Sequence, residues 1–284
     1  MFVWLASYPK SGNTLVRSML AAYFFSKDGI YNFDLLKNIN QFPNITLFQN
    51  LGIDIKNEKE VVKNYIKVQE SFNKKNSVQF LKTHSYLFNI ENNPFTDLKN
   101  SLGAIYIVRD PRNVVTSYAH HTNRTIDKAA DDLINLSQMG GDLTNSEFSQ
   151  RTKVYTGTWN SNYQSWKSFN QQNKYLLIKY EDLIKKKEKI FIEILNFIYE
   201  LQKIKFKLEQ SKFDNVIKTT SFSNMKKLEE NGGFFENKID QKTGKKIPFF
   251  NLGEKNEWKN LLDNKVRKKI ENAFKKEMIE LDYL

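Results

Sequence analysis

Short apolar runs alternate along this chain with longer stretches in which apolar residues recur every three or four positions. The runs at 2–7, 78–82, 104–108 and 175–179 predict strands, and the absence of polar alternation at 104–108 predicts a strand that is covered on both faces. Helical spacing predicts helices at 14–25, 61–72, 158–169, 187–199 and 266–279. Strands separated by helices predict a three-layer α/β domain, with a mainly parallel central sheet flanked by helices.

The segments between these elements are less regular. Residues 28–55 predict loops and short helices, 127–150 a loop with some helix, and the Gly-rich stretch 229–256 a long functional loop. Asp110 followed by Pro111 predicts the start of a helix, because an aspartate caps the first turn and proline fits its first position. The aromatic stripe in 158–169 is more typical of a core than of a base-stacking platform.

Composition narrows the class of protein. The chain has 284 residues, which we interpret as a single domain over 1–284, with 40% hydrophobic and 27% charged residues. It contains no cysteine, which excludes disulfides, cysteine–zinc sites and a thiol nucleophile, and favours a cytoplasmic location. The first apolar run is too short for a signal peptide or a membrane span. With only three histidines, we expect no metal site.

The net charge of +12 is unevenly spread, with +3 in residues 1–142 and +9 in residues 143–284. Such a basic chain can bind nucleic acid, a membrane surface or an anionic small molecule. Most of the charge is nevertheless expected on solvated helix faces, including the lysine runs 185–187 and 268–269. Arginine is scarce, with six in the chain, and two of these are Arg109 and Arg112.

The loop after the first strand carries the clearest chemical signal. It has the sequence Tyr-Pro-Lys-Ser-Gly-Asn-Thr at 8–14 and lies between a predicted buried strand and a helix, where α/β sheets bind ligands. Gly12 lets backbone N–H groups converge on an anion at the helix N-terminus, Lys10 adds a charge, and Ser11 and Thr14 add hydroxyls. We therefore predict a P-loop-like phosphate-binding turn. The pattern G-x-x-x-x-G-K-[ST] is absent, since Lys10 precedes the glycine.

This loop resembles the 5′-phosphosulfate loop of the sulfotransferases that use 3′-phosphoadenylyl sulfate (PAPS). Residues 105–118 resemble the 3′-phosphate segment of that family, with Arg109 and Ser117 eight residues apart, and Leu-Lys-Thr-His at 81–84 resembles its catalytic strand end. Further nucleotide-contacting pieces of the family are similar to 180–183, 220–225 and 250–253, the last followed by Trp258 and Lys259. The matches follow the family order over nearly the whole chain.

The resemblance implies in-line transfer of a sulfuryl group from PAPS to a hydroxyl or amine, with release of PAP and without a metal. His84 would be the general base, since a neutral imidazole can take the acceptor's proton near neutral pH. Lys10 would neutralise the charge that builds on the leaving 5′-phosphate. Lys82 lies two residues before His84, on the same face of the predicted strand, and would stabilise the sulfonate.

The resemblance also implies a nucleotide site. Lys10, Ser11, Gly12, Asn13 and Thr14 would hold the 5′-phosphate, and Arg109 and Ser117 the 3′-phosphate. Tyr180, Thr220, Phe222 and Met225 would line the adenine, with Gly253 in the C-terminal nucleotide loop. The alternatives are a salt bridge of Arg109 with Asp110 or a neighbouring residue, and simple core packing for the four adenine residues.

The chain departs from the family pattern in three places. Leu15 stands where the family often has a tryptophan, and Asn251-Leu252-Gly253 stands where it has Arg-Lys-Gly. The lost cations leave Lys245, Lys246 and Lys255 as candidates to compensate for them. A dimerisation motif seen in some relatives is not recognisable at 263–269, so the oligomeric state stays open.

Two other classes of function stay open beside the sulfotransferase. One is a nucleotide or small-molecule kinase, which the missing Walker lysine disfavours. The other is a non-catalytic protein that binds nucleic acid or a partner through its basic second half. We expect neither nucleic acid nor membrane as a partner.

The acceptor is the least constrained part of the interpretation. It can be a small molecule or a glycan, a phenol, an alcohol, a peptide or an amine, contacted by loops at 28–60, 85–95, 125–150 and 229–250. Four aromatic residues in these loops either form an apolar acceptor pocket or belong to the core: Phe33, Tyr86, Phe88 and Phe234. His120 and His121 are interpreted as structural or acceptor-side.

Overall fold

A four-stranded parallel sheet forms the centre of the molecule. The computed structural model describes residues 1–74, 77–136, 138, 153–239 and 244–284. The strands are β1 (Phe2–Ser7), β2 (Gln79–Thr83), β5 (Ser101–Val108) and β6 (Tyr175–Lys179), in the order β2-β1-β5-β6. Every neighbouring pair is parallel. The predicted sheet and its four strands are confirmed, and β5 begins three residues earlier than expected.

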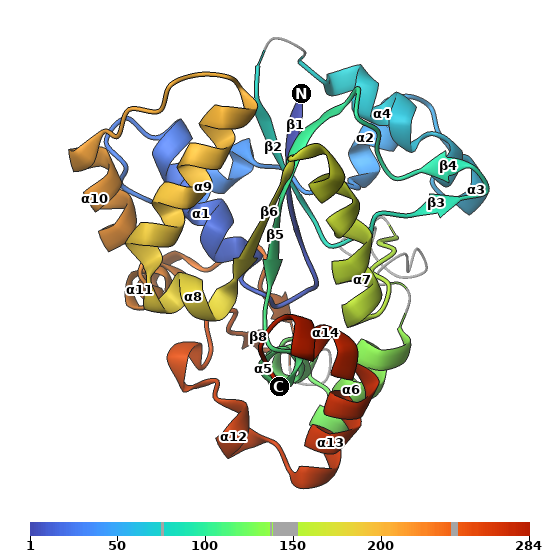
Figure 1. Ribbon diagram of the computed structural model, residues 1–284, viewed down its shortest axis with the longest axis vertical. Coiled ribbons are helices and arrows are strands. Elements are labelled where there is room, and N and C mark those ends of the chain that lie inside the picture. The colour runs from blue at the N-terminus through green and yellow to red at the C-terminus, as the bar shows by residue number, and fades with distance from the viewer. Residues whose placement is uncertain (75–76, 137, 139–152, 240–243) are drawn as a thin grey trace.

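Helices cover both faces of this sheet, which gives the predicted three layers (Figure 1). Successive side chains of a strand point to opposite faces, so Trp4 and Val3 of β1 belong to different hydrophobic cores. One core receives α1 (Asn13–Phe25), α9 (Lys187–Leu201), α10 (Gln210–Thr219) and α11 (Phe222–Gly232). The other receives α4 (Tyr65–Phe72), α5 (Pro111–Thr122), α6 (Ile126–Asn135) and α7 (Trp159–Trp166).

Two of the predicted helices are interrupted. The helix expected at 61–72 is α3 (Glu58–Lys63) followed by α4, and the break lies at Asn64, whose side chain bonds the carbonyl of Glu60. The helix expected at 266–279 is α13 (Asn264–Ala273) followed by α14 (Lys275–Glu280). Phe274 separates them, and its ring packs 5.1 Å from that of Trp159. Tertiary packing therefore divides each of these two stretches into two helices, although the apolar spacing predicted one continuous helix.

The irregular segments contain more structure than their sequence indicates. Helices α10 and α11 were not predicted, and 229–256 is helical as far as Gly232. Of the predicted loop at 127–150, α6 occupies the first part, and 139–150 lies outside the described residues. The other short elements are η1 (Phe33–Asn38), α2 (Ile45–Gln49), β3 (Asn89–Ile90), β4 (Asn93–Pro94), η2 (Lys167–Gln172), α8 (Tyr180–Lys185), β7 (Lys238–Ile239), β8 (Lys246–Ile247), η3 (Gly253–Lys255) and α12 (Trp258–Leu261).

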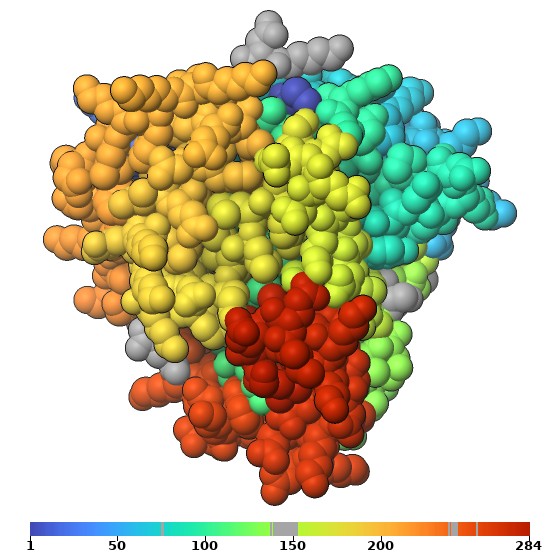
Figure 2. Space-filling model, in the orientation of Figure 1, coloured from blue at the N-terminus to red at the C-terminus, as the bar shows by residue number. Residues whose placement is uncertain are grey.

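Arg112 ties the C-terminal segment to the start of α5. Asp110 caps α5 as predicted, by accepting the N–H of Arg112, and its carboxylate also pairs with the guanidinium of that residue. The same guanidinium bonds Glu271 and the carbonyl of Tyr283, and it lies 4.0 Å over the ring of Trp258. Figure 2 shows the resulting packing, with the red C-terminal segment against the yellow part of the chain.

None of the helices in the part of the chain that the structure describes has the length and hydropathy needed to span a bilayer.

Trp4 offers a direct test of the core on which the sheet is built. It is fully buried, packs against Phe42, Phe95 and Trp166, and donates a hydrogen bond of 2.8 Å to Ser101. We expect Trp4→Ala to lower the free energy of unfolding by about 3–5 kcal/mol, measured by chemical denaturation. Leu98→Ala, at an exposed position, is the control and should change it by less than about 0.5 kcal/mol. Equal effects of the two would contradict the fold.

Candidate active site

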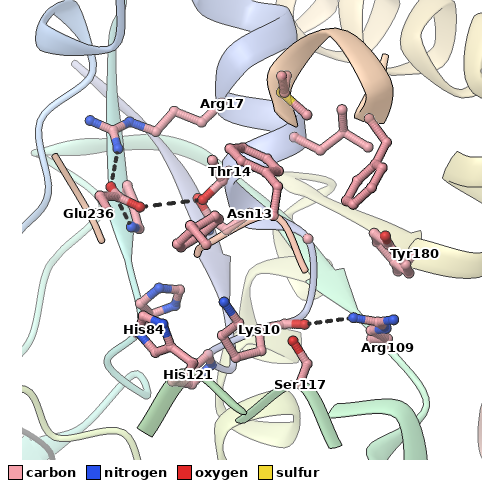
Figure 3. A pocket seen from close by; sticks show the side chains of 18 of the residues that line it. Lys10, Asn13, Thr14, Arg17, His84, Arg109, Ser117, His121, Tyr180 and Glu236 are labelled. Carbon is pink, nitrogen blue, oxygen red and sulfur yellow. Dashed lines mark hydrogen bonds and ion pairs between the residues drawn. The ribbon is translucent and has the colours of Figure 1, made fainter. Parts of the chain in front are cut away.

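The carboxyl ends of all four strands of the sheet meet at one cavity. The turn that contains Lys10 follows β1, His84 follows β2, Arg109 follows β5 and Tyr180 follows β6. All four residues line a cavity of about 870 Å³. In Figure 3, His84 lies toward one end, Arg109 and Tyr180 toward the other, and Lys10 between them. Parallel pairing thus brings together residues that are up to 170 positions apart in the sequence.

The turn after β1 has an unusual backbone that glycine and side-chain bonds hold in place. Gly12 caps α1 at a φ of +101°, and Lys10 has a φ of +66°, a region that non-glycine residues seldom adopt. Asn13 donates from its side chain to the carbonyl of Leu5 at 2.8 Å and to the hydroxyl of Ser7 at 3.2 Å. The turn is therefore fixed to β1, with the N–H groups that open α1 at the edge of the cavity.

His84 is held in one orientation and in one tautomer. Its Nδ1 lies 2.9 Å from the carbonyl oxygen of Ser7, and because a carbonyl only accepts, Nδ1 carries the proton. Nε2 is then left with the lone pair. Burial, together with the ammonium group of Lys82, lowers the pKa of His84 to about 3, so the imidazole stays neutral near neutral pH. A neutral ring with a basic Nε2 can accept a proton.

Glu236 joins two buried cations at the His84 end of the cavity. One oxygen of its carboxylate accepts from Arg17 at 2.7 Å and from Lys82 at 3.0 Å, and the other accepts from Thr14 at 3.5 Å (Figure 3). Arg17 also bonds the carbonyls of Leu36 and Ile39. Although burial alone would raise it, the pKa of Glu236 is held at about 2 by Lys82 and Arg17. The carboxylate therefore stays charged and fixes the position of Lys82.

Arg109 and Ser117 lie together in the cavity, as their eight-residue spacing predicts. The guanidinium of Arg109 donates to the carbonyl of Lys10 at 3.2 Å and lies 4.3 Å over the ring of Tyr180. Its buried Nε has no hydrogen-bond partner among the described residues. The alternative of a salt bridge to Asp110 is wrong, because Asp110 pairs with Arg112.

The far end of the cavity is more apolar. Phe222, Met225, Thr220 and Gly253 all line it, as does Leu15 at the position of the missing tryptophan. Gly253 has a φ of +56°, and a Cβ there would lie 2.6 Å from the ring of Phe222. The hydroxyl of Thr220 is bonded to the carbonyl of Val216 within its helix. This part of the cavity is therefore lined mainly by apolar side chains.

Some expectations about individual residues need correction. Ser11 is fully buried and does not line the cavity. Neither do Lys245, Lys246 and Lys255, which were the candidates to replace the two lost cations. The four candidate acceptor aromatics, Phe33, Tyr86, Phe88 and Phe234, pack in the hydrophobic cores, because they are flanked by other aromatic rings on several sides. Phe235 and Phe249 line the cavity in their place.

Three charged residues of the cavity were missed from the sequence. Lys187 was expected with its two neighbours on a solvated helix face; Lys185 and Lys186 are exposed, whereas Lys187 is half-buried and lines the cavity. Arg17 and Glu236 belong to a helix and a loop with no recognisable motif. For Arg17 the sequence offered one indication of a special role, namely that the chain has only six arginines.

The two neighbouring histidines differ in their contacts. The ring of His121 packs edge-on against Phe249 with 5.8 Å between centroids, and Nε2 of His120 lies 3.1 Å from the carbonyl oxygen of Pro248. Both line the cavity beside the loop that contains Phe249. Over the described ranges, no cluster of three or more histidine, aspartate or glutamate side chains has the arrangement of a metal site.

A cavity of this kind, with a phosphate-binding turn, several cations and an oriented neutral histidine at the edge of a parallel sheet, defines a nucleotide-dependent group transferase. The sulfotransferase domain model matches residues 2–282. The chain belongs to the sulfotransferase domain family. It is an enzyme that transfers a sulfuryl group from PAPS to an acceptor and releases PAP.

Relatives and solved structures agree with this assignment. The chain is 24% identical to flavonol 3-sulfotransferase of Flaveria bidentis over 95% of its length and 79% of that protein, and 24% identical to mouse sulfotransferase 1E1 over 96% and 82%. A mouse sulfotransferase, SULT7A1, in complex with PAP has the same fold, with a TM-score of 0.60 and 20% identity over 97% of this chain and 83% of that one. Retinol dehydratase in complex with androsterone and PAP gives a TM-score of 0.58, at 17% identity over 98% and 80%.

Glu236→Gln tests the buried ion network. The amide cannot neutralise Arg17 and Lys82, so we expect the free energy of unfolding at pH 7 to fall by roughly 3 kcal/mol. The depressed pKa means that this stabilisation is complete above the ordinary glutamate pKa of about 4.3 and is lost as the pH falls toward 2. Denaturation at several pH values should show a steeper acid-dependent loss of stability in the wild type than in the variant, which keeps only the contributions of other carboxylates such as Glu58 and Glu280. An identical pH dependence of both proteins would contradict it.

Gly12→Ala tests the contact between the turn and Tyr180. A Cβ at Gly12 would lie 2.4 Å from Cδ2 of Tyr180, so the ring must move. We expect PAP binding, measured by calorimetry, to weaken by roughly tenfold or more. Gly52→Ala is the matched control, because Gly52 also has a positive φ, of +69°, but no atom lies within 4 Å of an added Cβ. Equal losses in both variants would show that backbone strain alone is responsible.

Proposed function

We propose that this sulfotransferase transfers the sulfuryl group of PAPS to a hydroxyl of a small-molecule acceptor, with His84 as the general base. The observation that carries the proposal is the Nδ1–Ser7 hydrogen bond, which leaves the basic Nε2 of His84 in a cavity shared with Lys10 and Lys82. The acceptor oxygen attacks sulfur and gives its proton to Nε2. The bond between sulfur and the bridging oxygen breaks, and PAP leaves with that electron pair on its 5′-phosphate.

Lys10 and Lys82 supply the electrostatic part of this reaction. Lys10 follows β1 directly and is positioned by the left-handed backbone of the turn, so its ammonium can neutralise the 5′-phosphate as PAP leaves. Lys82 is kept beside His84 by Glu236 and would hold the sulfonate. Binding of the polyanionic donor would also raise the low pKa of His84, because negative charge favours the imidazolium. The histidine then becomes a stronger base when the donor is bound.

The nucleotide would lie along the cavity from the turn to its apolar end. Backbone groups of Gly12, Asn13 and Thr14 would hold the 5′-phosphate, with Ser11 acting through the backbone since its side chain is buried. Arg109 would take the 3′-phosphate, since its buried Nε has no hydrogen-bond partner in the described part of the chain, and Ser117 would add a hydroxyl.

The apolar end of the cavity would hold the base. Phe222 and Met225 would pack on the adenine, and Tyr180, Thr220 and Gly253 would complete this end.

The acceptor would enter beside His84 and bring an apolar body. Gln41 pairs with Lys82, and Tyr155 bonds the backbone of Tyr86, so the segments around Gln41 and Tyr155 border the histidine. The apolar lining residues on these segments are Pro43, Ile45 and Val154, and Phe235 lies next to Glu236. The flavonol that names one relative and the androsterone bound to one structural neighbour are small molecules with apolar bodies and hydroxyls. We therefore favour such an acceptor over a glycan.

We further propose that residues 1–284 act as a single domain, because both hydrophobic cores are built on one sheet. A cytoplasmic location is proposed on the absence of cysteine in the chain.

Replacement of His84 and Lys10 tests the mechanism. With labelled PAPS and a panel of flavonols, steroids and simple phenols, we expect His84→Gln to lower turnover by about 10²- to 10⁴-fold while PAP still binds. Lys10→Ala should lower both turnover and PAP affinity, since its charge serves the ground state and the transition state. Lys185→Ala, an exposed lysine outside the cavity, is the control. Turnover by His84→Gln within about tenfold of the wild type would contradict the role of the base.

A further inference from the structure

Lys187 is a half-buried cation that lines the cavity. It opens α9 and lines the cavity with Ile184 and Ile217, while Lys185 and Lys186 point to solvent. Burial lowers the pKa of Lys187 to about 8. A lysine that could extend into water, as its neighbours do, loses solvation by lying here. The contacts of its ammonium group should therefore explain why Lys187 lies in the cavity.

The ammonium group has one protein partner in the described structure, and that partner is a helix carbonyl. Nζ donates to the carbonyl oxygen of Ile217, in the last turn of α10, at 2.8 Å. No ion pair joins Lys187 to a carboxylate in the described ranges. An ammonium has three N–H donors and a carbonyl has two lone pairs. Both groups can therefore make a further hydrogen bond to a ligand in the cavity.

The neighbours of Lys187 indicate which part of the ligand it meets. Lys187 bonds the last turn of α10, and Thr220 at the end of that helix lines the cavity together with Phe222 and Met225 of α11. Lys10 and Arg109 belong instead to the turn after β1 and to the end of β5. Under the proposed function the phosphates lie with these two cations and the adenine lies among the apolar residues. Lys187 is thus placed to meet the base and not the phosphates.

We propose that Lys187 and the carbonyl of Ile217 together recognise the adenine of the nucleotide. The 6-amino group of adenine is a donor, and each ring nitrogen beside it, N1 or N7, is an acceptor. A donor and an acceptor 2.8 Å apart on the protein form the complementary pair. Lys187 donates to one of these ring nitrogens, and Ile217 accepts from the amino group. The inference rests on the proposed function, because it takes PAPS and PAP as the ligands.

The same pair disfavours a 6-oxo purine. In guanine or hypoxanthine an oxygen replaces the amino group, so with N7 bonded to Lys187 an acceptor faces the carbonyl of Ile217 where adenine presents a donor. A buried site built to bond a particular polar group rejects analogues that leave its own groups unpaired. The structure thus assigns selectivity for the base to a helix carbonyl, and affinity for the base to the lysine beside it.

A purely structural role for Lys187 makes different predictions. In a purely structural role, Lys187 would stabilise α10 from outside, by donating to a carbonyl at the C-terminus of that helix and by interacting with the helix dipole. Its loss would then lower the stability of the protein, but the binding of analogues that differ at one ring nitrogen would not change relative to PAP.

The experiment compares the affinities of nucleotides that differ in their base for the wild type and two lysine variants. We would measure the affinities of PAP, of its 1-deaza and 7-deaza analogues and of 3′-phosphoinosine 5′-phosphate by calorimetry, for the wild type, Lys187→Met and the control Lys185→Met. We expect Lys187→Met to weaken PAP binding by about 10- to 100-fold, and one deaza analogue to lose a similar factor with the wild type. That analogue and PAP should bind Lys187→Met equally. Lys185→Met should behave as the wild type.

The outcomes separate this inference from the function on which it rests. If Lys187→Met binds PAP as tightly as the wild type, or if the deaza analogues lose the same factor in both proteins, the assignment of Lys187 is overturned while the enzyme remains a sulfotransferase. If the wild type binds no PAP, the proposed nucleotide site itself fails. Where the 7-deaza analogue shows that N7 bonds Lys187, the inosine nucleotide tests Ile217 without any variant, and binding equal to that of PAP would then overturn its role. Thermal denaturation of both lysine variants reports whether they fold.

Discussion

Parallel pairing of β1 with β2 on one side and with β5 on the other is the constraint on which the site depends. The register places Ala6 opposite Thr83 and Ser7 opposite Ile107, so the residues that follow these strands emerge together. The carbonyl of Ser7 can therefore orient the ring of His84, and the guanidinium of Arg109 can bond the carbonyl of Lys10. A change of one residue in this register would turn His84 to the opposite face of the sheet.

The electrostatics of the cavity follow from that geometry. Four strand ends and two helices bring lysine and arginine side chains into one cavity, and the site has to limit the repulsion between them. Glu236 offsets part of the charge of Arg17 and Lys82, burial and Lys82 keep His84 uncharged, and Arg109 and Lys187 are satisfied in part by backbone carbonyls. A ligand with several negative charges and a flat base complements this distribution, since phosphates match the cations and the base matches the apolar end.

Much of this arrangement could be predicted, because its signals are local. The strand at 2–7, the turn at 8–14 and the cap at Asp110 each depend on residues adjacent in sequence, and the structure confirms these elements and brings His84, Lys82, Arg109 and Ser117 to one cavity. Helices α10 and α11 could not be predicted, because each offers only three apolar residues in a mainly polar sequence and is stabilised by packing in the core that α1 and the sheet share.

The sequence by itself determined the class of fold, the chemistry of the turn and the order of the nucleotide-contacting segments, because these depend on periodicity and short motifs. Only the tertiary structure decided that Lys187 lines the cavity while the two lysines before it are exposed. It also decided that Glu236 bonds both Arg17 and Lys82, and that the four candidate acceptor aromatics pack in the cores. The physical reason is that burial and charge pairing depend on which distant segments share a space, and residue spacing along the chain carries no such information.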